Sequence, residues 1–348
     1  MLRRWVAALL VLGVVTIATG CAEPAKTAKA LPKVGFVPQN TTFNYAVEMA
    51  EGFRSGVKQV GGVDAAVVGP AVVDGPAQLG MFQELTGGPI AGVAVHTAFG
   101  DLFAAPMAQA GTKGVAMMTL DSRPPPSSNV KLFVGNDNQQ LGQLLADQVI
   151  EKIPADATGK IVIGSPTPGT HALDQRGVGM REQIRKRLPG VKVLGPFETK
   201  REAGLNLGTW TKLVKANPTA LAFLGTGNAD AISLAKLRAS TGGTWQAGAF
   251  DLETDALNAV RAGQLVLVSP EHFLKGAIAG RLLATQAKDR KPLPQGWLYL
   301  PGLAVNPSNI NAIIARQASI EAKEAYFNPL VDKIIEDPAS LRPLDKVT

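Results

Sequence analysis

The sequence contains little of what catalytic and metal-binding sites are usually built from. Its 348 residues include a single cysteine, Cys21, and three histidines. One cysteine excludes a disulfide within the chain, and three histidines limit any histidine-rich metal site. The chain has no Gly-x-Ser-x-Gly turn, phosphate-binding loop or His-Glu-x-x-His pair, so it lacks these signals of hydrolases, nucleotide-binding enzymes and metalloproteases. We therefore expect no catalytic residue, no metal and no cofactor.

Aromatic and charged residues are also scarce, at 5% and 18% of the chain, whereas hydrophobic residues make up 46%. This composition is typical of a soluble globular protein and suits short buried parallel strands. The net charge is +7, but no basic run is interleaved with aromatics. The densest positive stretch, Arg181–Arg187, has the pattern of a solvated helix face. The charge pattern therefore predicts no nucleic-acid partner.

The longest apolar run lies at the N-terminus, from Trp5 to Thr19, after Arg3 and Arg4. At 15 residues it is shorter than the roughly 20 that a membrane-spanning helix needs, and it fits the hydrophobic region of an export signal. The run ends Ile17-Ala-Thr-Gly-Cys21, with small residues before the cysteine, as lipoprotein signal peptidase requires. An ordinary secreted protein and a buried free cysteine are the alternatives.

On the lipoprotein interpretation, residues 1–20 are a signal peptide and Cys21 becomes the lipidated N-terminus. Residues 21–32 are polar, contain proline and show no periodic pattern, so they are expected to form a flexible tether. The chain would then be anchored to the cell membrane by its lipid and face the extracytoplasmic side.

From Lys33 onward, short apolar runs alternate with segments of helical periodicity. Such alternation predicts βαβ units and parallel sheets. The series is too long for one compact sheet, and it starts again at Lys160, which indicates two doubly wound α/β domains. The runs expected to be strands are 34–37, 65–68, 90–95, 114–119, 160–163, 191–194, 220–224, 246–250 and 265–269.

Several short motifs in this part of the chain occur together in one known family. They are Val34-Gly-Phe-Val-Pro-Gln39, Thr119-Leu-Asp121, Val134-Gly-Asn-Asp-Asn138 with Gly142, Arg176-Gly-Val-Gly179, Asn228-Ala-Asp230 and Ala249-Phe-Asp251. In order and spacing they resemble the ribose-type periplasmic substrate-binding proteins of bacterial ABC sugar importers, over about residues 33–305. The related sugar repressors begin with a helix-turn-helix, whereas this chain begins with the predicted lipoprotein signal.

The resemblance implies a type 1 periplasmic binding protein-like fold, with two doubly wound parallel-sheet lobes joined by a three-strand hinge. Lobe 1 would comprise residues 33–135 plus 271–301, and lobe 2 residues 136–270 plus 302–308. Residues 309–348 would form a C-terminal extension, in which Ile310, Ile313 and Ile314 have the spacing of an amphipathic helix packing on a lobe.

The resemblance also implies a ligand site at the carboxyl ends of the strands. Asp121 and Asp251 correspond to family carboxylates that bind sugar hydroxyls, and Arg176 to a guanidinium that binds sugar oxygens. Asn228 lies in a similar position. The alternatives are ordinary structural roles, namely turn or N-cap positions for the aspartates and a surface position in the first turn of a helix for the arginine.

Phe43 and Tyr45 follow the first strand, where related proteins stack aromatic rings on a sugar. A hydrophobic cap on the helix start is the alternative. The family often has a second aromatic where this chain has Thr199, so polyols and small furanoses fit as well as a pyranose. His96, His171 and His272 all fall in strand-end loops without the paired spacing of a metal site, and we expect His96 to be a hydrogen-bonding partner of the ligand.

The function implied is capture of a sugar, polyol or similar small polyhydroxyl solute, followed by docking of the monomeric protein on an ABC transporter permease. A ligand-sensing subunit that reports to a membrane receptor kinase or chemoreceptor is the alternative.

The lipid anchor can be tested with Cys21→Ala. Without its thiol the chain cannot be acylated, so we expect the variant in the aqueous phase of a detergent partition and the wild type in the detergent phase. If the variant enters the detergent phase to the same extent as the wild type, lipidation at Cys21 is contradicted.

Overall fold

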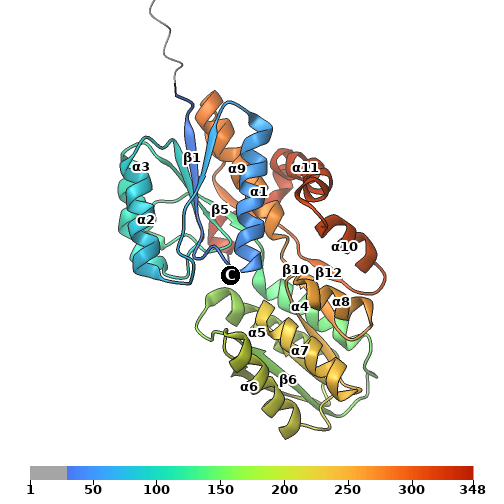
Figure 1. Cartoon of the computed structure of the whole chain (residues 1–348). Coiled ribbons are helices and arrows are strands. Elements are labelled where there is room, and N and C mark those ends of the chain that lie inside the picture. The colour runs from blue at the N-terminus through green and yellow to red at the C-terminus, as the bar shows by residue number, and fades with distance from the viewer. Residues whose placement is uncertain (1–29, 348) are drawn as a thin grey trace, which may run out of the picture. The chain divides into compact units, whose positions relative to one another are not determined.

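The computed structural model describes residues 30–347 (Figure 1). The predicted signal peptide, Cys21 and nearly all of the tether lie outside the described residues. Within residues 30–347, no helix combines the length and the apolar character needed to cross a membrane.

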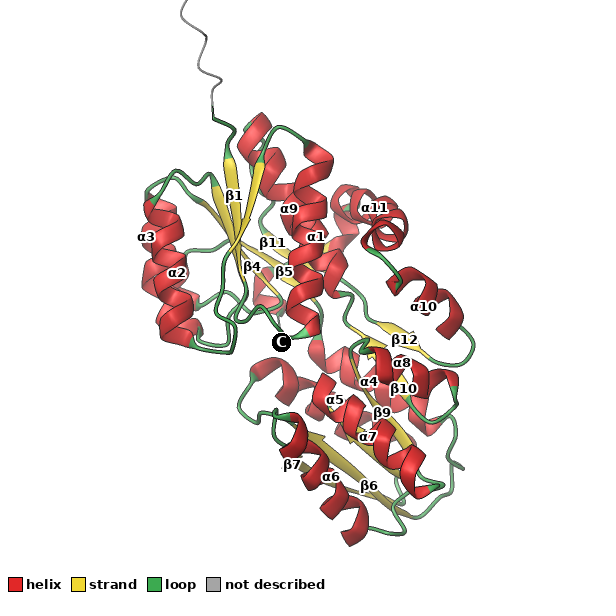
Figure 2. Ribbon diagram, in the orientation of Figure 1, coloured by secondary structure: helices red, strands yellow, loops and turns green. Residues whose placement is uncertain are grey.

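The first lobe is built on a seven-stranded sheet, which Figure 2 shows in yellow among its helices. Helices cover both faces, which is what a parallel sheet with crossover helices requires. In spatial order its strands are β13 (Leu341–Arg342), β11 (Gly296–Tyr299), β5 (Leu132–Gly135), β4 (Ala116–Leu120), β3 (Gly92–Val95), β1 (Lys33–Val37) and β2 (Asp64–Val67). On one face, α1 (Asn44–Val60), α9 (His272–Asp289) and α11 (Ile320–Glu336) enclose an apolar core, and on the other face α2 (Gly75–Gly87) and α3 (Gly100–Thr112) enclose a second.

The second lobe is built on a six-stranded sheet that is also covered on both faces. Its order is β12 (Leu303–Val305), β10 (Val266–Ser269), β9 (Gln246–Phe250), β8 (Ala222–Gly225), β6 (Gly159–Ser165) and β7 (Val191–Glu198). One face packs on α4 (Asn138–Ile150) and α5 (His171–Arg187). The other packs on α6 (Ala203–Ala216), α7 (Asn228–Thr241), α8 (Thr254–Arg261) and α10 (Ile310–Gln317).

The prediction of two doubly wound α/β lobes is therefore confirmed. The chain passes between the sheets four times, first at residues 135–138, 269–272 and 299–303 and then after β12, on the way through the C-terminal helices to β13. Two details differ from an all-parallel architecture. β12 is antiparallel to β10 and β13 is antiparallel to β11, because neither strand follows a crossover helix from its sheet neighbour.

The segment after the last crossing is more elaborate than the single amphipathic helix expected. α10 places Ile310 and Ile313 in the core of the second lobe, whereas α11 places Phe327 and Val331 in the core of the first. β13 then extends the sheet of the first lobe.

Two helix pairs pack with their backbones in direct contact, and glycines make this possible. α1 crosses α9 at Gly52 and Gly276, where a Cβ on either glycine would overlap a carbonyl oxygen of the other helix. In the second lobe, α4 crosses α5 at Gly142 and Gly179 in the same way. Gly179 of the Arg176–Gly179 motif thus sets the distance between these helices, which in turn fixes the position of Arg176.

This close packing predicts that Gly276→Ala destabilises the fold. The added methyl group meets the carbonyl of Met49, and overpacking of this kind costs about 1–3 kcal/mol. Gly208→Ala, in the exposed middle of α6 where a Cβ meets nothing within 4 Å, is the matched control and should gain about 0.5–1 kcal/mol. Urea unfolding measures both, and similar unfolding free energies for the two variants would contradict the packing argument.

Candidate functional site

Acidic residues with an unusual backbone conformation mark the strand ends that face the space between the lobes. Asp121 follows β4, Asp251 follows β9, and Glu271 lies two residues after β10. Their φ angles are 56°, 74° and 58°, in the left-handed region that residues other than glycine rarely adopt. Such conformations concentrate at ligand sites, where the surrounding structure holds them.

A cavity lies between these strand ends, and both lobes contribute to it. Residues of the first lobe come from the turns after β1, β3 and β4 and from the starts of α1 and α9. Those of the second lobe come from α5, from α7 and from the turns after β6, β7, β8 and β9. The polar residues that line it are Gln39, Tyr45, His96, Asp121, Thr170, Arg176, Arg201, Asn228, Asp251 and His272. A larger cavity of about 550 Å³ lies beside β2 and α2, but it has none of the charge pairs described next.

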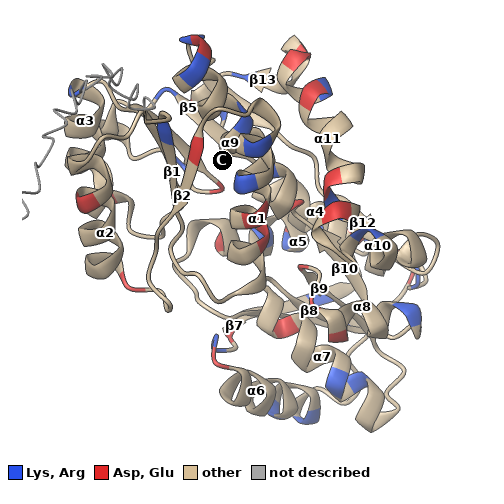
Figure 3. Ribbon diagram, turned by 45° about the horizontal axis from the view of Figure 1, so that its top comes forward, with Lys and Arg blue, Asp and Glu red and all other residues tan. Residues whose placement is uncertain are grey.

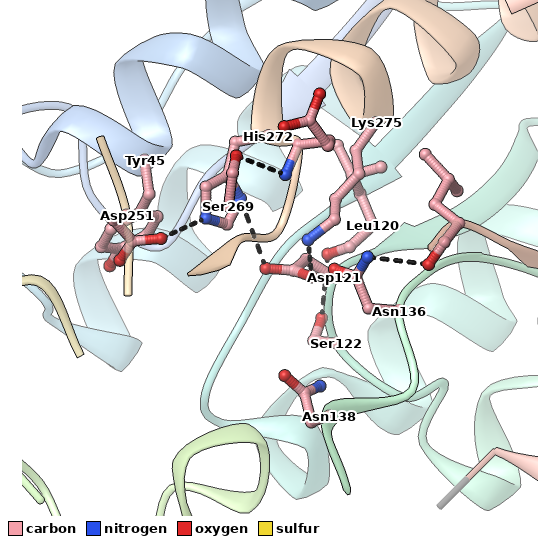
Figure 4. A network of polar contacts seen from close by, with 12 residues as sticks. Tyr45, Leu120, Asp121, Ser122, Asn136, Asn138, Asp251, Ser269, His272 and Lys275 are labelled. Atoms are coloured by element: carbon pink, nitrogen blue, oxygen red, sulfur yellow. Dashed lines mark hydrogen bonds and ion pairs between the residues drawn. The ribbon is translucent and has the colours of Figure 1, made fainter. Parts of the chain in front are cut away.

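The carboxylate of Asp121 is paired with a buried ammonium group (Figure 4). Lys275, in the first turn of α9, is 0% exposed, and its Nζ donates to Asp121 Oδ1. Burial lowers the pKa of Lys275, whereas the Asp121 charge raises it. Burial raises the pKa of Asp121, but Lys275 and the nearby imidazoles outweigh burial and hold the pKa well below its usual value. Asp121 is therefore ionised and charge-compensated inside the protein.

His272 lies between the two carboxylates. Its Nε2 is 3.0 Å from Asp251 Oδ1, and its Nδ1 is 3.7 Å from Asp121 Oδ2. An ionised carboxylate only accepts hydrogen bonds, so Nε2 carries the proton in the bond to Asp251. Burial raises the pKa of Asp251, but His272 and Arg176 outweigh it, and the pKa is lowered.

Arg176 is buried to 4% exposure and is fixed by three contacts within the second lobe. Its Nε donates to Asn138 Oδ1 and its Nη1 to the Thr226 carbonyl, both at 3.0 Å. The guanidinium lies 4.3 Å from the ring centroid of Phe250, within the range of a cation–π contact. Among the described residues these bonds use Nε and Nη1, which leaves Nη2 for a ligand.

Tyr45 and His96 complete the part of the cavity wall that the first lobe provides. Gln39 and Asn40 donate to the Tyr45 hydroxyl at 2.7 and 2.6 Å, so the hydroxyl proton is free to be donated elsewhere. Burial raises the pKa of Tyr45, so the group stays protonated at neutral pH. His96 stands edge-on to Tyr45 with ring centroids 5.9 Å apart, and its buried Nδ1 has no partner among the described residues.

Two predicted site residues, Asn228 and Phe43, lie apart from these central residues, and so does Thr199, where the family often has an aromatic. Asn228 lines the cavity but donates to Glu253 Oε1 at 3.0 Å. Phe43 lines a neighbouring cavity, where its ring centroid lies 5.6 Å from the guanidinium carbon of Arg201. Thr199 is fully buried and donates to Asp230 at 2.7 Å.

The structural alternative given for Arg176, a surface position in the first turn of a helix, is wrong. α5 begins at His171, so Arg176 lies inside the helix and is buried. Asn228 is the first residue of α7. His96 and His272 line the same cavity, whereas His171 is exposed outside it.

Sequence reasoning missed Lys275 altogether and assigned His272 no ligand role. A signal for Lys275 was present, because it interrupts the apolar run Phe273-Leu-Lys-Gly-Ala-Ile-Ala279. A charged residue on the buried side of a helix needs a partner. Within residues 30–347, no three His, Cys, Asp or Glu side chains are grouped so that they could hold a metal ion.

The chain belongs to a family whose model describes a periplasmic binding protein domain, which matches residues 34–291. A search of characterised proteins finds the D-allose-binding periplasmic protein of Escherichia coli, 24% identical over 259 residues, which cover 71% of this chain and 82% of that protein.

Solved structures show the same fold. One from Actinobacillus succinogenes, a periplasmic solute-binding protein with bound D-allose, has a TM-score of 0.73 and 19% identity over 81% of this chain and 99% of that chain. Another, from Burkholderia graminis in complex with D-arabinose, has a TM-score of 0.72 and 19% identity over 81% of this chain and 97% of that chain.

The burial of His96 predicts a pH dependence of stability. Burial lowers its pKa from 6.5 to about 4, so the unfolded chain binds the proton first as the pH falls. The stability that neutral His96 contributes is therefore lost between pH 6.5 and 4. His96→Gln should remove about 2 kcal/mol of the loss between pH 7 and pH 5.

Urea unfolding at these two pH values measures the effect. The exposed His171→Gln variant is the control and should retain the pH dependence of the wild type. An unchanged slope in His96→Gln would show that His96 is not buried in its neutral form.

Proposed function

We propose that this protein captures a small polyhydroxyl solute, a sugar or a polyol, between its two lobes for an ABC importer. The observation that carries the proposal is the meeting of Asp121, Arg176 and Asp251 from opposite lobes at one cavity. Family membership supports a binding protein rather than an enzyme. The relatives that bind D-allose and D-arabinose make such sugars the first ligands to test.

The pairing of the charged groups is what favours a neutral ligand. The charge of Asp121 is compensated by Lys275. Asp251 is hydrogen-bonded to His272, and the nearby charge of Arg176 also stabilises its ionised form. A ligand with a full charge would disturb this balance in a buried site, whereas hydroxyl groups can both donate to Asp251 and accept from Arg176. Tyr45 adds a hydroxyl donor and a ring face suited to the apolar face of a sugar.

We further propose the wider setting of this activity. The lobes would have the predicted boundaries, residues 33–135 plus 271–301 and residues 136–270 plus 302–308, and would close on the solute as a hinge. A lipid on Cys21 would hold the monomeric chain at the outer side of the cell membrane, where a permease receives the solute. Acidic and basic positions alternate on helices such as α11 (Figure 3), which is consistent with a partner other than nucleic acid.

Replacement of Asp251 tests the site. Asp251→Asn keeps the shape of the side chain but removes a charge-assisted hydrogen bond to a ligand hydroxyl, worth about 1.5–3 kcal/mol. Affinity should fall roughly 10- to 150-fold. The measurement is calorimetric titration with whichever of D-allose, D-arabinose and D-ribose most raises the melting temperature of the wild type.

Asp255→Asn is the matched control, because Asp255 is exposed on α8, four residues further along the chain. Wild-type affinity in Asp251→Asn would remove this residue from the site, and no thermal shift of the wild type with any of the three sugars would contradict the proposed solute class. Asp121 is less suitable as a probe, because its loss leaves the Lys275 ammonium buried without a partner.

A further inference from the structure

The C-terminal segment, residues 306–347, lies beyond the part of the chain that matches the family model. α10 belongs to the apolar core of the second lobe and α11 to that of the first, and only Ala318 and Ser319 separate the two helices. This segment therefore joins the lobes in addition to the three crossings of the hinge.

At the junction of these helices, Arg316 makes a buried contact with the hinge. Its Nη1 and Nη2 donate to the two carboxylate oxygens of Glu271 at 2.8 and 3.2 Å. Both residues are more than 90% buried, and the guanidinium also lies 4.7 Å from the ring centroid of Phe327. A two-point bond of this kind fixes orientation as well as distance.

Glu271 lies at the start of α9, directly before a residue of the candidate site. Glu271 occupies a left-handed conformation with φ 58°, where the chain passes from β10 into α9. A residue with a Cβ needs tertiary support to remain there. Arg316 holds the carboxylate of Glu271, and Ser269 Oγ accepts from its backbone amide. The next residue is His272, whose ring bonds Asp251 and faces Asp121 in the candidate site.

We propose that Arg316 of the C-terminal segment is a positioning residue for the ligand site, acting through Glu271 on the imidazole of His272. This inference rests on the proposed function for its consequence in binding, but the structural coupling it describes can be measured without any ligand. Further polar contacts tie the same junction to α1, since Gln317 donates to Glu48 and Lys323 lies 2.9 Å from Glu51.

The three histidines of the chain make the test direct. In histidine-labelled protein each imidazole gives its own NMR signal, and His96→Gln and His171→Gln assign them. Arg316→Met keeps an apolar side chain near Phe327 but removes both bonds to Glu271. We expect it to shift the His272 signal and leave that of His171 in place. Arg316→Lys keeps the charge but loses the two-point bond, so it should shift the His272 signal less than Arg316→Met does.

Asp332→Asn is the matched control. It breaks another ion pair between the C-terminal segment and the first lobe, Arg281–Asp332 at 2.8 Å, on a part of α9 remote from Glu271, and it should leave His272 unchanged. If Arg316→Met fails to fold because Glu271 is left charged and unpaired, the double variant Arg316→Met with Glu271→Gln removes that charge and should show the same shift.

An unshifted His272 signal in the folded variant would overturn the proposal. Calorimetry with D-allose, D-arabinose and D-ribose then measures the consequence, an expected loss of affinity of about tenfold from one weakened hydrogen bond. If the wild type binds none of these sugars, the proposed function is wrong while the NMR comparison still decides the role of Arg316. If a sugar binds equally to both proteins, Arg316 has no part in ligand binding.

Discussion

Compensation of buried charge is the constraint on which the candidate site depends. An unpaired carboxylate or ammonium group buried between the lobes would carry a large desolvation penalty and destabilise the fold. Lys275 therefore bonds Asp121, His272 bonds Asp251, and Arg176 is bonded to Asn138 and stacked on Phe250. Once paired, these groups can present fixed polar atoms to a ligand without disturbing the fold around them.

The rest of the architecture serves this pairing. Left-handed turns after β4 and β9 place the two carboxylates beyond the ends of their strands. Glycine contacts between α1 and α9 bring the first turn of α9, with His272 and Lys275, up to the first carboxylate, and those between α4 and α5 set the depth of Arg176. The C-terminal segment contacts the residue just before this helix, since Arg316 donates to Glu271. Backbone packing and site chemistry are thus parts of one arrangement.

The sequence predicted the two lobes well, because alternating apolar runs and helical periods depend on local spacing. Through the family resemblance it also named Asp121, Arg176 and Asp251 as candidates, and the structure brings these three residues to one cavity. It could not pair Asp121 with Lys275, because the two lie 154 residues apart and nothing local connects them. Nor could it divide the C-terminal segment between the lobes, since the spacing of Ile310 and Ile313 defines an apolar face but not the surface it covers.

The most direct test of this account is a double-mutant cycle on the buried pair, with Lys275→Met, Asp121→Asn and both together, measured as unfolding free energies in urea. If each charge is present only because the other compensates it, each single variant should lose about 3 kcal/mol or more, and the double variant should lose far less than the sum, with a coupling free energy of about 2–3 kcal/mol. Additive losses would contradict the account, because they would mean that the two charges are stabilised independently of each other.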